Sequence, residues 1–548
     1  MTRSNRAKNL PNFVCRIALL VFVCGIALPG LAAAPAKEKL LAATPPMGWN
    51  DWAHYQCGFT AQTILSNAQA LVKTGLAARG YNTVTIDDCW MQKDRDAHGN
   101  LQPDPKRFPN GMKAVAQAIH AMGLKFGIYE DAGYETCGGF AGSGVPNGGG
   151  KDHFLQDTRL FASWGVDYLK LDGCNLYIPK GGSQLESYHQ AYAAQSAAIR
   201  QVGRPIVFSE SAPAYFQGTP QWYDVLTWVR DYGQLWREGT DVAVYDEKKP
   251  NDPRFPSVLW NYAYNLPLGR FQRPGNWNDS DFIIGGDAGM SMAESRSQLS
   301  LWSMMSAPLI LSSNLSKVSP QAIKLLGNQS VIAIDEDPLG RMATLVRRSP
   351  DMDLLFKKLS RGDYAIAVLN HGTTPLPVDL HPSDFGFPNR VGCRLNAENL
   401  WNGTHPYSLQ ADVSSHDTVI WRMHPTSACG APKRTGVILV LAPGDHEAFK
   451  GYTRCLAAPG VVGDCAGTSA EAWTVTSAGG LKSGGRCLAF AGGKPVMQPC
   501  TKNSAQRWKY TLAGNLIDAG GQCLTAGGSL SMQTCGYNQR NQIWSLPD

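Results

Sequence analysis

The sequence predicts a multidomain protein that begins with a parallel α/β domain, a (β/α)8 barrel. An antiparallel β-sandwich follows, and a domain of three short repeats comes last. Three observations support this architecture. β-rich runs alternate with helical stretches over residues 40–340, short alternating strands fill residues 341–450, and a Cys and Trp pattern recurs in residues 452–548. A chain of 548 residues is long enough for two or three domains of ordinary size.

Residues 1–34 have the features of a secretory signal peptide. Arginine and lysine side chains precede an apolar run from Ile17 to Leu28, and small residues from Gly30 to Ala34 follow it. The run is too short to be preferred as a membrane anchor, and no later segment matches it in length and apolarity. We therefore expect a secreted protein, extracellular or periplasmic, with no membrane partner.

The cysteine content agrees with export. Removal of Cys15 and Cys24 with the signal peptide leaves twelve of the 14 cysteines, an even number that falls in sequence-local pairs. Such pairs are typical of disulfides in an oxidising compartment, although spacing alone does not establish the connectivity. The alternative, twelve free or zinc-bound thiols, lacks the repeated C-x-x-C spacing of zinc sites. The pairs are Cys57/Cys89, Cys137/Cys174, Cys393/Cys429, Cys455/Cys465, Cys487/Cys500 and Cys523/Cys535.

The net charge argues against one class of partner. A formal charge of +6 is spread over 548 residues, and part of it leaves with the signal peptide. Proteins that bind nucleic acids carry a concentrated basic surface, so we expect no nucleic-acid partner.

The first domain is predicted to be a barrel because its strands are regularly spaced. Eight β-rich runs recur at intervals of roughly 30 to 45 residues, and helical stretches such as Asp157–Trp164 and His189–Arg200 separate them. This alternation favours a parallel barrel over a sandwich. In such a barrel, the carboxyl ends of the strands meet at one rim, where enzymes of this fold place their sites. The runs are Met47–Asn50, Asn82–Asp87, Lys125–Tyr129, Asp167–Asp172, Pro205–Ser209, Gln234–Arg237, Gly275–Asn278 and Pro308–Ser312.

The fourth run carries the strongest indication of chemistry. It ends in Asp172, followed by Gly173 and Cys174, which places a carboxylate at the rim of the sheet. By the two-residue period of a strand, Tyr168, Lys170 and Asp172 share one face, so we expect Lys170 beside Asp172. A neighbouring ammonium group keeps a carboxylate ionised, and an ionised carboxylate can act as a nucleophile.

The first two strand ends add aromatic and acidic groups. Met47–Trp52 contains two tryptophans, whose rings suit the apolar faces of sugars. Asp87 and Asp88 follow the second run, where adjacent carboxylates need hydroxyl donors or a cation between them. A divalent cation is the weaker interpretation, because Lys170 and Arg237 supply positive charge and no third acidic ligand is nearby in sequence. We expect no metal and no cofactor.

The later strand ends complete the rim. Tyr129 ends the third run, Phe208–Tyr215 contains the end of the fifth, and Trp236–Asp241 contains the end of the sixth. Asn276–Asp281 approaches the site from the side of the eighth strand. Several carboxylates with flanking aromatic rings and no metal motif are what glycoside hydrolysis requires, with one carboxylate as nucleophile and another as general acid and base.

The second and third domains are predicted from their strand patterns. The runs Leu354–Leu359 and Tyr364–Asn370 indicate an antiparallel sandwich that packs against the barrel. In the last domain, the segment Cys487–Trp508 recurs as Cys523–Trp544, and a degenerate copy, Cys455–Trp473, precedes them. Periodic cysteine and tryptophan positions of this kind predict three similar units that share one core.

These repeats resemble the ricin-type β-trefoil lectin fold. In that fold, the glutamine of each Gln-x-Trp is structural, and sugars bind in shallow pockets, one in each unit. The aspartate that such lectins carry two positions after the first cysteine is replaced by Ala457, Ala489 and Thr525. A structural role and a sugar-binding role therefore both stay open, and no ligand residue is named. With this resemblance, the predicted fold class is a TIM barrel, then an antiparallel β-sandwich, then a β-trefoil.

The barrel resembles glycoside hydrolase family 27, the α-galactosidase (melibiase) and α-N-acetylgalactosaminidase group of clan D. The resemblance runs from Thr44 to about Leu339 and rests on Pro46–Trp49, Ile86–Trp90, Gly127–Tyr129, Lys170–Cys174 and Trp277–Asp281. It implies that Asp172 is the nucleophile and Asp241 the acid/base. It also implies the disulfides Cys57–Cys89 and Cys137–Cys174. The sugar subsite that it implies is completed by Trp52, Asp87, Asp88, Tyr129, Lys170, Arg237 and Asp281.

The mechanism that the resemblance implies is a retaining double displacement. Asp241 protonates the glycosidic oxygen while Asp172 attacks C1, and Asp241 then deprotonates the water that releases the sugar. The two carboxyl groups of such enzymes lie about 5 to 5.5 Å apart. Asp241 must have the higher pKa of the two, and Lys170 is expected to lower the pKa of Asp172.

Substrate choice depends on the loop after the fifth strand, which in this family reads the C2 substituent of the sugar. A bulkier pair that includes an acidic residue favours a hydroxyl, whereas Ser and Ala leave room for an N-acetyl group. Ser211 and Ala214, before Tyr215, are similar to the α-N-acetylgalactosaminidase arrangement. Glu210, however, could itself reach a C2 hydroxyl.

Three functions follow from these features. The first is a secreted retaining α-galactosidase that releases terminal α-linked galactose from oligosaccharides, polysaccharides or glycoconjugates, because most of the family has that activity. The second is an α-N-acetylgalactosaminidase, because of Ser211 and Ala214. The third is a catalytically inactive carbohydrate-binding protein whose trefoil binds a glycan, and the intact Asp172 and Asp241 argue against it.

Overall fold

The computed structural model describes residues 40–440, 454–501, 503–536 and 539–547. The predicted signal peptide and the predicted domain boundary between residues 450 and 452 lie outside these ranges. Within them, every helix is too short or too polar to traverse a lipid bilayer.

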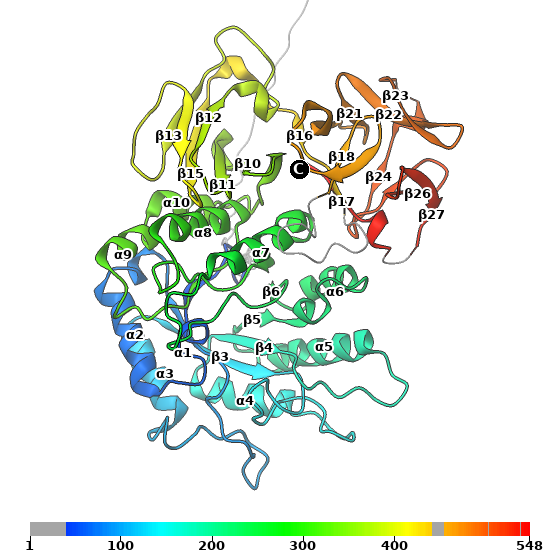
Figure 1. Cartoon of the computed structure of the whole chain (residues 1–548). Coiled ribbons are helices and arrows are strands. Elements are labelled where there is room, and N and C mark those ends of the chain that lie inside the picture. The colour runs from blue at the N-terminus through cyan, green and yellow to red at the C-terminus, as the bar shows by residue number, and fades with distance from the viewer. Residues whose placement is uncertain (1–39, 441–453, 502, 537–538, 548) are drawn as a thin grey trace, which may run out of the picture. The chain divides into compact units, whose positions relative to one another are not determined.

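The first domain is built on eight parallel strands in the order β7-β6-β5-β4-β3-β2-β1-β8. Figure 1 labels β3, β4, β5 and β6 of this sheet. Ile283, after β7, forms a parallel bridge with Leu311 of β8, and this bridge closes the sheet into a barrel. All eight predicted runs are strands, and the observed ends of each strand differ from the predicted ends by no more than two residues. The strands are β1 Met47–Asn50, β2 Thr83–Ile86, β3 Lys125–Asp131, β4 Tyr168–Asp172, β5 Val207–Glu210, β6 Leu235–Arg237, β7 Trp277–Asp279 and β8 Leu309–Leu311.

Helices separate the strands, as the alternating pattern predicts. α5 begins after Ser183, whose hydroxyl accepts the backbone NH of Glu186, and it ends at Gly203, which adopts a left-handed φ of 75°. α8 begins with a capping box in which Ser291 and Glu294 accept each other's backbone NH groups. The α-helices are α1 Trp52–Tyr55, α2 Ala61–Lys73, α3 Gly111–Ala121, α4 Phe154–Trp164, α5 Gln184–Val202, α6 Trp222–Trp228, α7 Phe255–Asn265, α8 Met292–Met305, α9 Pro320–Leu326 and α10 Gln329–Asp335.

The strand period decides which side chains face into the barrel. Tyr168 of β4, Leu235 of β6 and Trp277 of β7 are buried in one cluster. Such layers of side chains, contributed by alternate strands, fill the interior of these barrels. Lys170 and Asp172 follow Tyr168 on the same face of β4, so they point toward the barrel axis at the carboxyl end.

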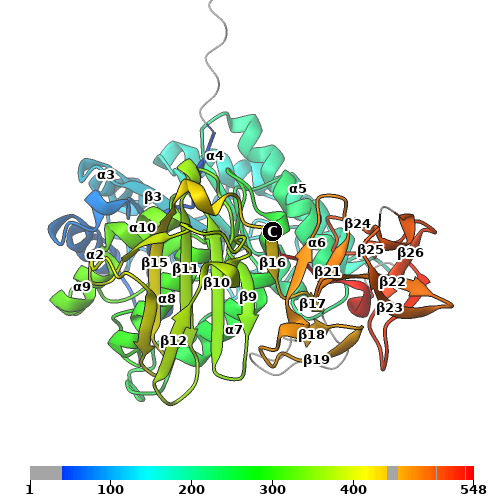
Figure 2. The same ribbon diagram turned by 90° about the horizontal axis from the view of Figure 1, so that it is seen from above.

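The second domain is an antiparallel sandwich, as predicted. A five-stranded sheet has the order β13-β15-β11-β10-β9, and β12 pairs with β14 in a second sheet. Figure 2 shows β15, β11, β10 and β9 side by side. Ile366, Val378 and Trp421 belong to one buried core that both sheets share. The strands are β9 Thr344–Arg348, β10 Met352–Lys358, β11 Tyr364–Asn370, β12 Leu376–Leu380, β13 Leu395–Asn399, β14 Leu409–Val413 and β15 Thr418–Pro425.

A buried lysine attaches the sandwich to the barrel. Lys357 of β10 is fully buried, although lysine is rarely found without solvent contact. Its ammonium group satisfies its hydrogen-bonding capacity with three oxygens that lie before the sandwich in the chain, those of Ser303, Ser306 and Ile334. The sandwich therefore packs against the barrel, as the sequence predicts.

The third domain contains three similar units around one core. Trp473, Trp508 and Trp544, one from each repeat, are buried in a single cluster. Gln506 and Gln542 each bind backbone groups of their own unit. In the first unit Glu471 takes the equivalent place and accepts backbone NH groups of residues 466–468. The Gln-x-Trp motif is therefore structural here, as the resemblance implies.

The sheets of the third domain also use two strands that precede residue 441. β16 pairs with β20, and β17 pairs with β18 and β28. The sheet orders are β16-β20-β21-β22-β23, β19-β18-β17-β28 and β24-β25-β26-β27. The strands are β16 Arg434–Gly436, β17 Leu439–Val440, β18 Arg454–Ala457, β19 Val461–Asp464, β20 Trp473–Val475, β21 Leu481–Ser483, β22 Arg486–Ala491, β23 Lys494–Pro499, β24 Lys509–Tyr510, β25 Leu516–Ile517, β26 Gln522–Thr525, β27 Ser531–Thr534 and β28 Trp544–Ser545.

Two consecutive arginines of β9 provide a test of buried against exposed ion pairs. Arg348 and its partner Asp353 are both buried, whereas Arg347, paired with Asp384, is 38% exposed. Arg348→Ala leaves a buried carboxylate without its counter-charge, so we expect a loss of roughly 3 to 5 kcal/mol. Arg347→Ala should cost less than about 1 kcal/mol. The midpoints of thermal unfolding of the two variants measure this difference, and equal midpoints would show that the buried pair is not the stronger constraint.

Candidate active site

The residues predicted to form the site lie at the carboxyl ends of the barrel strands. β3 and β4 run in register, so that Asp131 lies beside Asp172 at the rim. Enzymes with this fold bind their substrates at this rim. The predicted residues are Trp52 at the start of α1, Asp87 and Asp88 after β2, Tyr129 in β3, Lys170 and Asp172 in β4, Ser211 after β5, Ala214 and Tyr215 in the short 3-10 helix Ala212–Phe216, Arg237 at the end of β6, Asp241 after it, and Asp281 after β7.

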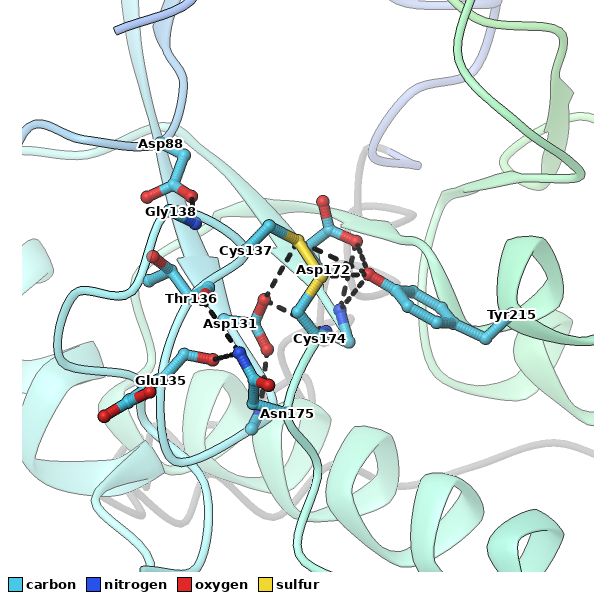
Figure 3. Close-up of a disulfide and its surroundings, with 12 residues drawn as sticks. Asp88, Asp131, Glu135, Thr136, Cys137, Gly138, Asp172, Cys174, Asn175 and Tyr215 are labelled. Carbon is cyan, nitrogen blue, oxygen red and sulfur yellow. Dashed lines mark hydrogen bonds between the residues drawn. A yellow bond between two sulfur atoms is a disulfide. The ribbon is translucent and has the colours of Figure 1, made fainter.

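A phenol and a backbone amide orient Asp172. Tyr215 donates its hydroxyl to Asp172 Oδ1 over 2.5 Å (Figure 3). Gly173 donates its NH to the same oxygen over 3.0 Å. Gly173 has no room for a side chain, because a Cβ would lie 2.8 Å from the Tyr188 ring and 3.0 Å from the Tyr215 ring. Among the described residues no donor binds Oδ2 of Asp172, so this oxygen is available for reaction.

A disulfide braces the loop beside Asp172. Cys137 and Cys174 are bonded, and the Tyr215 hydroxyl lies 3.2 Å from Cys174 Sγ (Figure 3). Asp131 accepts the backbone NH of Cys174 over 3.1 Å. The sequence-based site omits Asp131, and its register with Asp172 on the neighbouring strand is the signal that could have identified it. All six disulfides match the predicted pairs.

Potential metal ligands gather at one place in the described ranges. Asp131, Cys137 and Cys174 each have one ligand atom within 4.8 Å of the others. Both sulfur atoms belong to the disulfide, so they do not provide the thiolates that a metal would bind. This group is part of the wall of the site.

Lys170 binds Asp87 instead of Asp172. Its ammonium group donates to both oxygens of Asp87, over 3.0 and 2.8 Å, and both side chains are buried. The charge of Lys170 lowers the pKa of Asp172, as predicted, but its hydrogen bonds are made to Asp87 at the end of β2 and not to Asp172. Asn50 also donates to Asp87, over 2.7 Å, and it is a further residue that the sequence-based site omits. Tyr129 forms the adjacent wall, with its ring centre 5.1 Å from the ammonium group.

A cation and an indole hold Asp241. Arg237 donates to Asp241 Oδ1 over 3.0 Å, and Trp52 donates its ring NH to Oδ2 over 3.2 Å. The same guanidinium pairs with the buried Asp281 over 2.9 Å. Asp281 in turn accepts the backbone NH of Val242 over 2.6 Å, which fixes the loop that carries Asp241. The side chain of Asp241 is nevertheless 53% exposed, so a ligand can reach it.

The two carboxylates have pKa shifts in opposite directions. Burial raises the pKa of Asp172, and the charge of Lys170 and the hydrogen bond from Tyr215 offset this only in part. Partial burial would also raise the pKa of Asp241, but the charges of Arg237 and Lys170 outweigh it and lower that pKa. The prediction that Asp241 has the higher pKa is therefore wrong for this structure. The reason is Arg237, which contacts Asp241 directly, while no cation in the described part of the chain contacts Asp172.

Asp88 lies behind the disulfide loop. It accepts the backbone NH of Gly138 over 2.7 Å (Figure 3). It also accepts the backbone NH of Cys89 over 2.6 Å. Burial raises the pKa of its carboxyl group, and these hydrogen bonds lower it only in part. Asp88 therefore shapes the rim by holding the loop that contains Cys137.

Glu210 points away from the interior of the barrel. It is in register with Leu171, whereas the inward-facing Lys170 is in register with Ser209. Its carboxylate is buried against Gly233, where a Cβ would lie 2.3 Å from Oε1, and neither oxygen has a hydrogen-bond partner among the described residues. The prediction that Glu210 reaches a C2 hydroxyl is therefore wrong, because the strand period turns this side chain toward the helices.

Ser211 and Ala214 are held close to Asp172 by the turn that carries Tyr215. Ser211 donates its NH to Leu171 O, one residue before Asp172, and Ala214 donates to Ser211 O, each over 3.0 Å. The Ser211 hydroxyl is buried and has no hydrogen-bond partner in the part of the chain that the structure describes. A buried hydroxyl without a partner is costly, so it is available to a polar group of a ligand.

Three family models match the chain. Residues 44–337 match the family described as Alpha galactosidase A. Residues 349–423 match the Alpha galactosidase C-terminal beta sandwich domain, and residues 452–544 match the Ricin-type beta-trefoil lectin domain. These matches confirm the predicted fold class of barrel, sandwich and trefoil.

Two similar proteins and one solved structure extend this comparison. Alpha-galactosidase A of Aspergillus niger is 37% identical over 475 residues, which cover 84% of this chain and 84% of that protein. Alpha-N-acetylgalactosaminidase of Gallus gallus is 34% identical over 421 residues, which cover 72% of this chain and 99% of that protein. The crystal structure of alpha-galactosidase I from Mortierella vinacea matches with a TM-score of 0.62 at 28% identity, over 71% of this chain and 99% of that one.

The position of Glu210 predicts a pH-dependent loss of stability. Burial raises the pKa of Glu210 well above its ordinary value, and the nearby charge of Asp231 adds to this. The folded protein therefore retains a proton that the unfolded chain releases at about pH 4.3, and stability falls as the pH rises above that value. Glu210→Gln removes this loss, so its midpoint of thermal unfolding should rise relative to the unmodified protein as the pH increases. Glu247→Gln, at an exposed position, is the control, and identical pH profiles for the two variants would contradict the burial of Glu210.

Proposed function

The chain belongs to the alpha galactosidase A family of glycoside hydrolases, and we propose that it is a secreted retaining α-galactosidase. It releases terminal α-linked galactose from oligosaccharides, polysaccharides or glycoconjugates. The observation that carries the proposal is a pair of carboxylates in unlike surroundings at one rim of the barrel. Asp172 has one oxygen oriented and the other open, and Asp241 is half exposed and held by Arg237 and Trp52. Glycoside hydrolysis divides its work between two such carboxylates.

In the first step, Asp172 acts as the nucleophile. Tyr215 and Gly173 hold its Oδ1, which leaves Oδ2 to attack C1 of the sugar and form a covalent glycosyl-enzyme. The bond between C1 and the glycosidic oxygen breaks, and Asp241 donates a proton to the departing oxygen. In the second step Asp241 takes a proton from water, the water oxygen attacks C1, and the bond from C1 to Asp172 breaks.

The proposed acid role requires Asp241 to be protonated when substrate is bound. The charge of Arg237 opposes this, since it favours the ionised carboxylate and lowers the pKa of Asp241 despite partial burial. A substrate that covers the half-exposed Asp241 excludes water from it, and desolvation disfavours the ionised form. Substrate binding therefore raises the pKa of Asp241 in the direction that proton donation requires.

An α-N-acetylgalactosaminidase is the second candidate. Ser211 and Ala214 are small, and the buried hydroxyl of Ser211 has no partner in the described ranges. Both features favour a larger, polar C2 substituent such as an N-acetyl group. Because Glu210 faces the helices, the preference for galactose rests on the family relationship and not on an acidic C2 ligand.

The compartment and a second ligand also belong to the proposal. Six disulfides are typical of an oxidising environment, which supports an extracellular or periplasmic location. The similarity of the third domain to ricin-type lectins supports a glycan as its ligand. Neither domain organisation nor charge supports a nucleic-acid or membrane partner.

Initial rates on p-nitrophenyl α-galactoside and p-nitrophenyl α-N-acetylgalactosaminide, measured side by side, test the function. We expect hydrolysis of both to be absent in Asp172→Asn and the galactoside to be preferred by the unmodified protein. A preference for the N-acetyl substrate would instead support the second candidate, with Ser211 and Ala214 as the specificity determinants. Rates no higher than those of Asp172→Asn on both substrates would support a carbohydrate-binding protein without activity.

The hydrogen bond from Tyr215 predicts a pH effect on the nucleophile. The Tyr215 hydroxyl favours the ionised form of Asp172 and so counteracts the rise in pKa that burial causes. In Tyr215→Phe the pKa of Asp172 therefore rises, and the acidic limb of the kcat/KM profile, which reports ionisation of the nucleophile, should move to higher pH. Tyr188→Phe is the matched control, because Tyr188 donates to Gly173 O and not to the carboxylate. An acidic limb that stays in place in Tyr215→Phe would be inconsistent with Asp172 as the nucleophile.

A further inference from the structure

Helix α7 presents three polar side chains to the loops that follow β6 and β7. Ser257, Asn261 and Asn265 are spaced by four residues, so they lie one turn apart on the same side of the helix. Asn261 is only 1% exposed, and Asn265 is fully buried. Asparagine is a poor helix former and is mostly found at protein surfaces, so neither helix propensity nor apolar packing explains these two residues. The explanation is in their hydrogen bonds.

The amide of Asn261 joins the two loops. Its NH2 group donates to Thr240 O over 3.0 Å, in the loop after β6, and to Ser280 O over 3.1 Å, in the loop after β7. Asn265 donates to the hydroxyl of the same Ser280. The side-chain oxygen of Asn261 has no hydrogen-bond partner among the described residues, so this amide acts through its two donors alone.

Both acceptors of Asn261 belong to peptide bonds that carry an acid of the proposed site. Thr240 directly precedes Asp241, and Ser280 directly precedes Asp281. A peptide bond is planar, so a carbonyl group that is held in place also fixes the nitrogen atom of the next residue. One amide therefore sets the positions of Asp241 and Asp281 relative to each other.

Two further hydrogen bonds hold the backbone after Asp241. Asp281 accepts the NH of Val242 over 2.6 Å, and Ser257 accepts the NH of Ala243 over 2.8 Å. The loop that carries Asp241 is thereby fixed to α7 both before and after this acid.

The backbone of Asp281 needs the support that Asn261 gives. Its φ of 77° is in the left-handed region, which residues other than glycine adopt at a cost in free energy. Such a conformation persists only where the surrounding contacts impose it. Asn261 holds the carbonyl group before it, Asp279 accepts its NH over 2.9 Å, and Trp302 donates to its carbonyl oxygen over 2.8 Å. These contacts keep Asp281 where it pairs with Arg237.

The sandwich anchors the same helix at the residue next to Asn261. Tyr262 donates its hydroxyl to Asp353 of β10 over 2.8 Å, and Asp353 is paired with Arg348. All three side chains are buried. A helix that is fixed in this way is a rigid base for a side chain that must hold a reactive group in place.

We infer that Asn261 is a positioning residue for proton transfer, which keeps the carboxyl group of Asp241 directed at the glycosidic oxygen. The inference rests on the proposed function. Without the amide, Asp241 retains its contacts with Arg237 and Trp52, but the peptide bond that carries it is free to turn. General acid catalysis depends on alignment, so proton donation becomes slower. Attack by Asp172, on the other side of the barrel sheet in β4, does not use this amide.

Two substrates that differ only by a nitro group separate proton donation from the rest of the reaction. Phenyl α-galactoside releases a basic phenolate, whose departure needs a proton. The nitro group stabilises the phenolate that p-nitrophenyl α-galactoside releases, so that substrate needs the proton less. The ratio of kcat/KM for the phenyl substrate to kcat/KM for the p-nitrophenyl substrate therefore falls when acid catalysis is impaired. A smaller amount of folded enzyme lowers both rates and leaves the ratio unchanged.

Asn261→Leu keeps a branched side chain of similar size, removes both donors and adds no charge, and we expect it to lower the ratio about tenfold. Asn261→Ala leaves room for water to bind the two carbonyl groups, and it should lower the ratio as well. Asn370→Leu is the matched control. The buried NH2 group of Asn370 also donates to two carbonyl oxygens, those of Thr374 over 2.7 Å and Val413 over 2.9 Å, but it lies in the sandwich. Its loss should leave the ratio unchanged.

Midpoints of thermal unfolding show which variants are folded at the temperature of the assay. An unchanged ratio in both Asn261 variants, or an equal fall in Asn370→Leu, would overturn the inference. Failure of both Asn261 variants to fold would also overturn it, because the amide would then serve stability alone. If the unmodified protein hydrolyses neither substrate faster than Asp172→Asn does, the proposed function is overturned, and the inference with it.

Discussion

The carboxylates at the mouth of the barrel depend on two buried cations, Lys170 and Arg237. Lys170 binds both oxygens of Asp87, and Arg237 lies between Asp241 and Asp281. Without these cations the clustered acidic groups would repel one another, and at least one would be protonated. Among the described residues no cation pairs with Asp172, and its Oδ2 accepts no hydrogen bond, so this oxygen is free to react. Which carboxylate can act as the nucleophile therefore depends on which carboxylates pair with Lys170 and Arg237.

The sequence pattern identifies most of the architecture because the relevant signals are local. Strand runs, helix periodicity and neighbouring cysteines correctly predict the eight barrel strands and the six disulfides. The two-residue period also places Lys170 and Asp172 on one face of β4. It does not say which neighbour a long side chain binds, because Lys170 and Asp87 are 83 residues apart in the chain. The sequence therefore predicts the electrostatic effect of Lys170 on Asp172 but misses the carboxylate that Lys170 binds.

Two other predictions were wrong for the same reason, because they also depend on contacts between residues that are far apart in the chain. Glu210 is the last residue of β5, just before the loop that contains Ser211 and Ala214. Only its register with Leu171 shows that its side chain faces the helices. The order of the pKa values of Asp172 and Asp241 depends on burial and on the exact position of Arg237, and neither can be read from spacing. In the third domain, by contrast, the motif alone predicts the three repeated units. Two residues before each buried Trp lies a Gln or Glu side chain that binds the backbone of its own unit.

Covalent attachment of the sugar to Asp172 is the step on which the proposed mechanism depends. A fluorinated galactosyl fluoride, whose glycosyl-enzyme turns over slowly, labels the nucleophile, and mass spectrometry of a protease digest locates the label. We predict one fluorogalactosyl group on the peptide that contains Asp172, and no label on Asp172→Asn. A label on a different carboxylate, or an active enzyme that is inactivated without any covalent label, would contradict the role assigned to Asp172.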